Sequence, residues 1–91
     1  MATTATKVHE SQIGNKVYQE WNFSIGGSDT TASWATGLKN VTTFIPVTTS
    51  AEINGTPARN SDDGTEDSAF GTVYVADLAN STTGYALVIG N

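Results

Sequence analysis

The sequence predicts an all-β fold, a small antiparallel β-sandwich or barrel of five to six short strands. Charged residues make up only 14% of the chain, against about 25% in an average domain. Thr, Ser, Asn and Gly take their place, which favours strands joined by polar turns over helices. Apolar runs recur at a spacing of roughly ten residues with turn signals between them. No segment shows a sustained helical period.

The chain has 91 residues, enough for a single β domain, which we assign to residues 7–91. Residues 1–6 are small and polar and are expected to form a flexible N-terminal arm. A domain of this size buries only about two-thirds of the surface of its unfolded chain. It must therefore be compact or gain stability from a partner. The chain has no cysteine, which argues for an intracellular origin or for stability supplied by assembly.

The charge balance excludes some classes of partner. The net charge is −5 and the sequence pI is about 4.4, so phosphate backbones would be repelled and no nucleic-acid partner is expected. The N-terminus lacks the basic and apolar regions of a secretory signal. No apolar run reaches the length of a membrane span, so no membrane partner is expected either.

The first half of the chain predicts a hairpin. Residues 7–13 alternate weakly and suggest an edge strand, and Gly14-Asn15 suggests the turn. Residues 16–25 alternate clearly, which predicts a half-buried strand. Its core face would hold Val17, Gln19, Trp21, Phe23 and Ile25. A turn is expected at residues 26–29.

The central stretch from Trp34 to Val47 turns at Thr36-Gly37 and continues as a strand. Strict alternation would place Val41, Thr43, Ile45 and Val47 on one face and Thr42, Phe44 and Pro46 on the other. Pro46 removes a ladder donor, so this strand should lie at an edge or carry a bulge at that point.

The second half is an irregular stretch, 51–69, followed by two strands. Residues 70–77 and Tyr85–Asn91 both carry apolar groups on both faces, more than one small core can readily cover. The first should be interior and the last should be buried. The predicted core consists of Trp21, Phe23, Ile45, Val73, Val75, Leu87 and Ile89.

An acidic cluster at residues 60–67 is the first candidate for chemistry. Asn60, Asp62, Gly64 and Glu66 resemble part of a cation-binding loop, because hard cations take several oxygens from one short segment. The spacing does not match the EF-hand pattern. We therefore expect residues 58–68 to form a solvated loop without an obligatory metal, or one that faces a basic patch on a partner.

Catalytic chemistry has little support in the sequence. His9 is the single histidine, and no nucleophile elbow accompanies it. Glu10 and Glu20 could face each other across the first hairpin as glycosidase carboxylates do, but a sandwich of this size offers little cleft. We predict no catalytic, cofactor-binding or metal-binding residues, and no enzyme. The aromatic residues would form either a carbohydrate-stacking face or part of the core or a subunit interface: Tyr18, Trp21, Trp34, Tyr74 and Tyr85.

Two segments carry a resemblance to a known class of protein. Trp-Ala-Thr-Gly-Leu-Lys-Asn-Val at 34–41 and Tyr-Ala-Leu-Val-Ile-Gly at 85–90 resemble small, cysteine-free, β-rich structural proteins of tailed bacteriophages. The resemblance implies a non-enzymatic capsid decoration or cement protein on the outside of the virion, assembled in the host cytoplasm. Its partners would be the major capsid protein and further copies of itself, with a trimer favoured over a dimer. The alternative is a receptor- or glycan-binding β domain of a tail fibre or spike. The acidic loop is not part of the resemblance.

Overall fold

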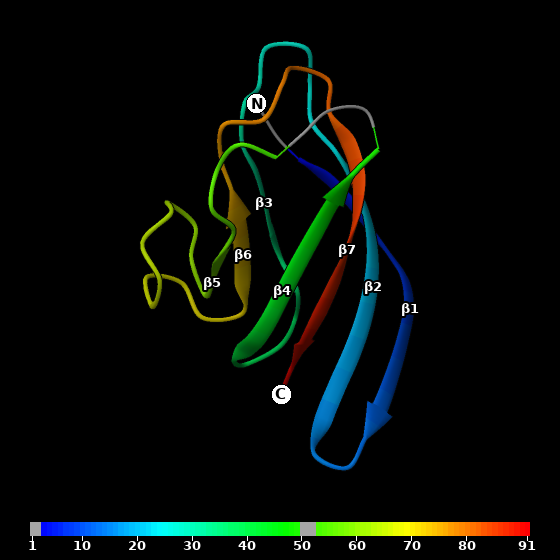
Figure 1. Cartoon of the computed structure of the whole chain (residues 1–91). Helices are drawn as coiled ribbons and strands as arrows, with labels where there is room; N and C mark the ends of the chain where they lie inside the picture. Colours follow the sequence, from blue (N-terminus) through cyan, green and yellow to red (C-terminus); the bar gives the residue numbers. More distant parts are fainter. Residues whose placement is uncertain (1–2, 50–52) are drawn as a thin grey trace.

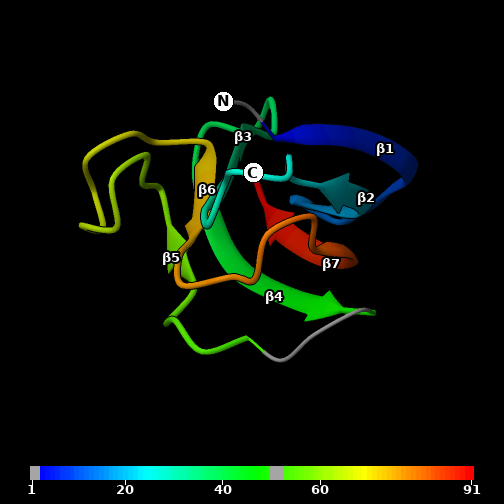
Figure 2. The ribbon, with the colours of Figure 1, turned by 90° about the horizontal axis from the view of Figure 1, so that it is seen from above.

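A computed structural model describes residues 3–49 and 53–91, which form two antiparallel sheets and no helix (Figure 1). The four-stranded sheet has the order β1-β2-β7-β4, and the three-stranded sheet the order β3-β6-β5. The sheets remain open instead of closing into a barrel (Figure 2). The all-β prediction is confirmed, with seven strands in place of five or six: β1 Thr4–Ile13, β2 Lys16–Ser24, β3 Ala32–Ala35, β4 Val41–Thr48, β5 Ala58–Arg59, β6 Thr72–Val75 and β7 Thr83–Gly90.

The predicted first hairpin is present, but β1 begins at Thr4 and not at Lys7. Thr4 pairs with Ser24 in β2, so the expectation of a free arm was wrong for residues 4–6. The preceding residue is also engaged, because the Thr3 hydroxyl accepts a hydrogen bond from Ser33 N–H at 2.9 Å. Residues 1 and 2 of the expected arm lie outside the described residues.

The central stretch crosses from one sheet to the other, which places Trp34 of β3 between the two sheets. Its ring lies 5.9 Å from Trp21, 5.2 Å from Phe23 and 5.7 Å from Phe44, measured between centroids. Aromatic pairs at these separations add to the stabilisation from apolar burial. Trp34 is therefore the centre of an aromatic cluster that joins both sheets.

The predicted core is confirmed in one part and wrong in another. Phe23, Val73 and Val75 are buried, and Trp21 is partly buried against them. The remaining residues were wrongly assigned to the core, because their register places them on the opposite, outer face of the four-stranded sheet: Ile45, Leu87 and Ile89.

A β-bulge explains the error in β4. Val41 pairs with Gly90 and Thr43 with Ile89, so Thr42 is an extra residue in β4. The bulge lets Val41 and Phe44 both point inward, where they are buried. The prediction that Val41 shares a face with the odd-numbered residues after it was wrong for this reason.

The positions of the later strands follow the sequence more closely. β6 is the middle strand of its sheet and β7 lies between β2 and β4, as expected for strands with apolar residues on both faces. β4 is an edge strand, which agrees with Pro46. The expectation that the last strand is buried holds for its inner face, where Ala86 and Val88 are buried, but was wrong for its outer face, where Tyr85 is 51% exposed.

Candidate functional site

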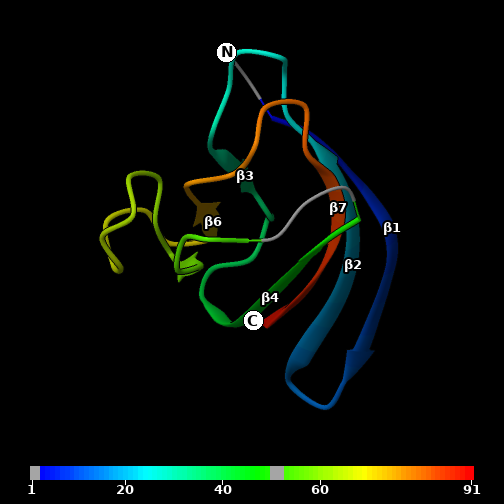
Figure 3. The ribbon, with the colours of Figure 1, turned by 45° about the horizontal axis from the view of Figure 1, so that its top comes forward.

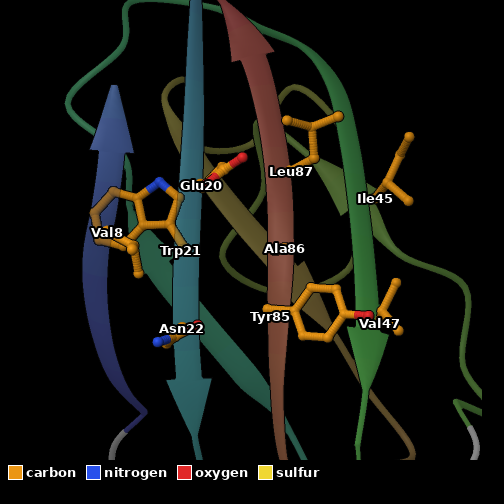
Figure 4. Close-up of a pocket in the computed structure, with 9 residues that line it drawn as sticks. All are labelled: Val8, Glu20, Trp21, Asn22, Ile45, Val47, Tyr85, Ala86 and Leu87. Carbon is orange, nitrogen blue, oxygen red and sulfur yellow. The ribbon is translucent and has the colours of Figure 1, made fainter. Parts of the chain in front are cut away.

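The outer face of the four-stranded sheet carries a row of apolar side chains that no other described element covers. Figure 4 shows this face, with the three-stranded sheet behind it. Exposure is 50% for Ile45, 39% for Val47 and 51% for Tyr85. Leu87 and Ile89 of β7 are partly exposed on the same face. We call these five residues the apolar strip.

The register makes the apolar strip continuous. Tyr85 lies opposite Val47 on one side and Asn22 on the other, and Leu87 lies likewise between Ile45 and Glu20. Directly opposed side chains on one face of a sheet are in contact distance. The face is therefore apolar over β4 and β7 and polar over β2.

An open groove of about 390 Å³ runs along this face and is completed by Val8 of β1. Of the nine lining residues labelled in Figure 4, Glu20 alone carries a charge. Contiguous exposed apolar surface is uncommon on a monomer and marks interaction sites. The chemistry of the groove suits an apolar surface of a partner better than a charged ligand.

The acidic loop is held to the core by Asn60. Its side-chain oxygen accepts hydrogen bonds from the backbone N–H groups of Val41 (2.9 Å) and Gly71 (3.1 Å). Its amide nitrogen donates to the Val41 carbonyl and to Asn40 Oδ1, both at 2.9 Å. All the hydrogen-bonding capacity of this buried amide is used. Asn60 is thus a structural anchor and not the cation ligand that its place in the loop suggested.

The exposed part of the loop is ordered by its own hydrogen bonds. The Asp63 carboxylate accepts from Thr65 N–H at 2.9 Å and from the Ser68 hydroxyl at 3.1 Å, and these bonds lower the pKa of Asp63. Glu66 accepts from the backbone N–H of Arg59 at 3.0 Å and pairs with its guanidinium at 3.3 Å. Both interactions lower the pKa of Glu66.

The prediction of a solvated loop over residues 58–68 is confirmed for residues 62–68, which are exposed, but it was wrong for Ala58, Asn60 and Ser61, which are buried. The described residues contain no group of three or more His, Asp or Glu side chains arranged to hold a metal ion. The loop, whose sequence holds four carboxylates at residues 62–67, lies on the side of the three-stranded sheet (Figures 2 and 3).

His9 lies exposed on edge strand β1, where its Nε2 is 2.9 Å from the Ser11 hydroxyl. Hydrolases stabilise developing charge with donors fixed in a water-excluded site. This pair is open to bulk water, so its geometry offers little support for catalysis.

The possible glycosidase pair is not assembled. Glu10 accepts a hydrogen bond from the buried Gln19 side chain at 2.9 Å, whereas Glu20 lines the groove on the outer face. The two carboxylates thus belong to opposite faces of the sheet. Hydrogen bonds from Lys7 and then from Gln19 lower the pKa of Glu10.

The aromatic residues do not gather on one face. Trp21 and Trp34 pack together at the core, and Tyr74 lies beside Gly64 of the acidic loop. Tyr85 is exposed in the groove, with Tyr18 on the same face through its pairing with Ile89. A carbohydrate-stacking face built from all five is therefore excluded, although Tyr85 remains available.

Sequence reasoning pointed to surplus apolar residues in the last strand but missed the apolar strip itself. Both β4 and β7 carry apolar side chains on each of their two faces, so the sequence alone does not say which face is covered. The chain matches no protein-family model, no curated protein and no solved structure. Within the described residues, no helix is long and apolar enough to span a membrane.

Proposed function

We propose that this protein is a non-enzymatic structural protein of a tailed-phage virion. It binds the outside of the head as a cement or decoration protein and stabilises contacts between major capsid subunits. The resemblance of residues 34–41 and 85–90 to such proteins supports this proposal. The structural observation that carries it is the uncovered apolar strip, which suits a protein that functions in an assembly.

The energetics of a small domain support the same proposal. A shell that binds only the folded chain stabilises that chain against unfolding, which offsets the small core of a 91-residue chain. Cementing requires contact surfaces and no chemistry. The ordered acidic loop supplies a second surface, and Lys or Arg side chains on the capsid would pair with it. Such exposed pairs contribute orientation more than affinity.

The test is to delete the gene in its virus and to measure the heat stability of the heads. Heads that lack the protein should open at a lower temperature, and purified protein added back should restore the loss. A density map of the intact particle should place the protein on the outside of the head. Unchanged heat stability, or absence of the protein from purified heads, would contradict the proposal.

A receptor- or glycan-binding domain of a tail fibre is the second candidate, and Tyr85 favours it. Tyr85 lines both the apolar groove and a second hollow, whose other lining residues include Thr6, Asn22 and Thr83. An exposed ring next to such groups can stack on a sugar while they bind its hydroxyls. Location at the tail tip, with glycan binding that is lost in Tyr85→Ser, would select this candidate.

A further inference from the structure

The open edges of the four-stranded sheet are both guarded against strand addition. Directly after β4, Thr49 N–H donates to the Thr83 carbonyl. The register of β4 and β7 continues this pattern, so the backbone N–H and C=O groups of odd-numbered β4 residues face β7. Those of even-numbered residues, including Pro46, face the open edge. Its missing N–H therefore falls at the edge, where it interrupts pairing with another chain.

The opposite edge, β1, carries other protective features. Its register shifts between Lys7 and His9, which marks a bulge. Lys7 and Glu10 form a salt bridge of 2.8 Å along the strand, and both pair with core-side residues of β2, namely Trp21 and Gln19. Bulges and inward-facing charges are common means of preventing edge-to-edge association.

The three-stranded sheet offers no better edge. On β3, the Ser33 N–H is occupied by the Thr3 hydroxyl, and β5 is only two residues long. A partner that associates with this protein through its sheets would therefore pack on the face of a sheet and not add a strand to its edge. The outer face of the four-stranded sheet is the face that presents the apolar strip.

The size of this face is sufficient for a dimer. Strands of eight residues in a four-stranded sheet span an area of about 19 by 26 Å, or about 500 Å² per copy. Two copies would bury about 1,000 Å², the lower bound for a specific interface. The area of about 500 Å² that each copy contributes is about a tenth of its surface of 4887 Å², which is the usual share for a small protein.

The charge distribution is also compatible with two copies that pack through their apolar strips. The chain carries a net charge of −5, but four of its carboxylates belong to the 62–67 loop on the side of the three-stranded sheet (Figures 2 and 3). Packing strip against strip keeps these charges far apart. A strongly basic or acidic partner would find only Glu20 in the groove and would gain little from it.

We infer that the apolar strip is covered by a second copy of this chain, packed face to face about a two-fold axis. This inference rests on the proposed function in one respect, because both take the outer face of the four-stranded sheet as an interaction surface. It makes a two-fold pair the unit that binds the shell, in place of the trimer that the resemblance to capsid proteins favoured. The acidic loops of both copies are left free to contact the capsid.

Sedimentation equilibrium of the purified full chain tests the inference without any capsid. The wild type should be a concentration-dependent dimer. Ile45→Asp, which places a charge in the interface, should raise the dissociation constant at least about tenfold. Phe70→Asp is the matched control, because Phe70 is 59% exposed but lies outside the strip, and it should leave the constant unchanged. Circular dichroism melting verifies that each variant is folded.

Crosslinking supplies a second measurement, because the chain has no cysteine. A short thiol-to-thiol crosslinker should join two copies of Val47→Cys in high yield and should not join Phe70→Cys. A wild type that remains monomeric up to about 1 mM would overturn the inference. Dimers that persist in Ile45→Asp, or equal crosslinking of the two cysteine variants, would do so too.

The two proposals fail in distinguishable ways. A monomer that binds heads and protects them from heat would refute the two-fold pair and retain the cement role. A dimer that dissociates in Ile45→Asp but is missing from virions would support the two-fold pair and refute the cement role.

Discussion

At the scale of single residues, Asn60 shows how one buried amide can organise a long loop. Its backbone is in the left-handed region with φ of 51°, which Asn tolerates better than most residues. Its side chain joins the start of β4 to the segment before β6. The acidic loop between them is therefore attached at its base, even though its tip is exposed.

Replacing Asn60 by Ala should be strongly destabilising. The change would leave Val41 N–H, Gly71 N–H and the Val41 carbonyl without their partner, and each buried unpaired group costs about 1–3 kcal/mol. We expect a loss of at least about 3 kcal/mol in the free energy of unfolding by urea denaturation. Asn54→Ala, at an exposed asparagine, is the control and should change little. Similar small effects of both variants would refute the anchoring role.

Trp34 and Trp21 should differ in their contribution to stability. Trp34 is 8% exposed and contacts three aromatic rings, so Trp34→Ala should cost about 3–5 kcal/mol. Trp21 is only partly buried, so Trp21→Ala should cost less. Chemical denaturation of the two variants measures the difference, and the opposite order would show that the aromatic cluster is wrongly centred.

At the scale of elements, the acidic loop links stability to pH. Hydrogen bonds lower the folded-state pKa of Asp63 below its ordinary 3.8 and that of Glu66 below its ordinary 4.5. A carboxylate with a lowered pKa contributes stability above its unfolded value, and this is lost as the pH falls through the folded value. The melting temperature should thus be level near neutrality and fall as the pH drops below about 4.5.

A matched pair of variants assigns this pH dependence to the loop. Glu66→Gln removes the titrating group and should make the acid-induced fall in melting temperature shallower. Asp77→Asn changes an exposed aspartate outside both the loop and the groove and should preserve the slope of the wild type. Equal slopes for all three proteins would indicate that Glu66 is not linked to folding.

The edge of β4 should depend on Pro46 for its resistance to aggregation. Pro46→Val restores an N–H at the open edge and should increase light scattering on prolonged incubation near neutral pH. Thr43→Val adds the same side chain at a position whose backbone groups face β7, so it controls for apolar area alone. Aggregation that is equal in both variants would argue against an edge effect.

At the scale of the whole molecule, self-association should strengthen with salt. Each copy carries a net charge of −5, so two copies repel, and the Debye length falls from about 30 Å at 0.01 M salt to about 8 Å at 0.15 M. The dimer dissociation constant at neutral pH should therefore be lower at the higher salt concentration. Sedimentation equilibrium at both concentrations measures it, and weakening by salt would indicate that ion pairs hold the dimer.

Local patterns determined much of the fold. The alternation of residues 16–25, the Gly14-Asn15 turn and the edge position of Pro46 were all readable from the sequence. The interior place of β6 followed from its apolar residues on both faces. These features depend on the two-residue period and on the conformational limits of Gly and Pro, which are properties of a few neighbouring residues.

Tertiary structure decided which faces are covered. The bulge at Thr42 reverses the orientation of the side chains that precede it, so that Val41 is buried while Ile45 is exposed. A one-residue shift of this kind turns a strand over, and the Val-Thr-Thr-Phe-Ile-Pro-Val pattern does not reveal it, because it has apolar residues on both faces in either register. The anchoring role of Asn60 was hidden for a similar reason, because its partners lie 11 and 19 residues away. The apolar strip is exposed because β4 and β7 carry apolar side chains on both faces, and the fold covers only the inner one.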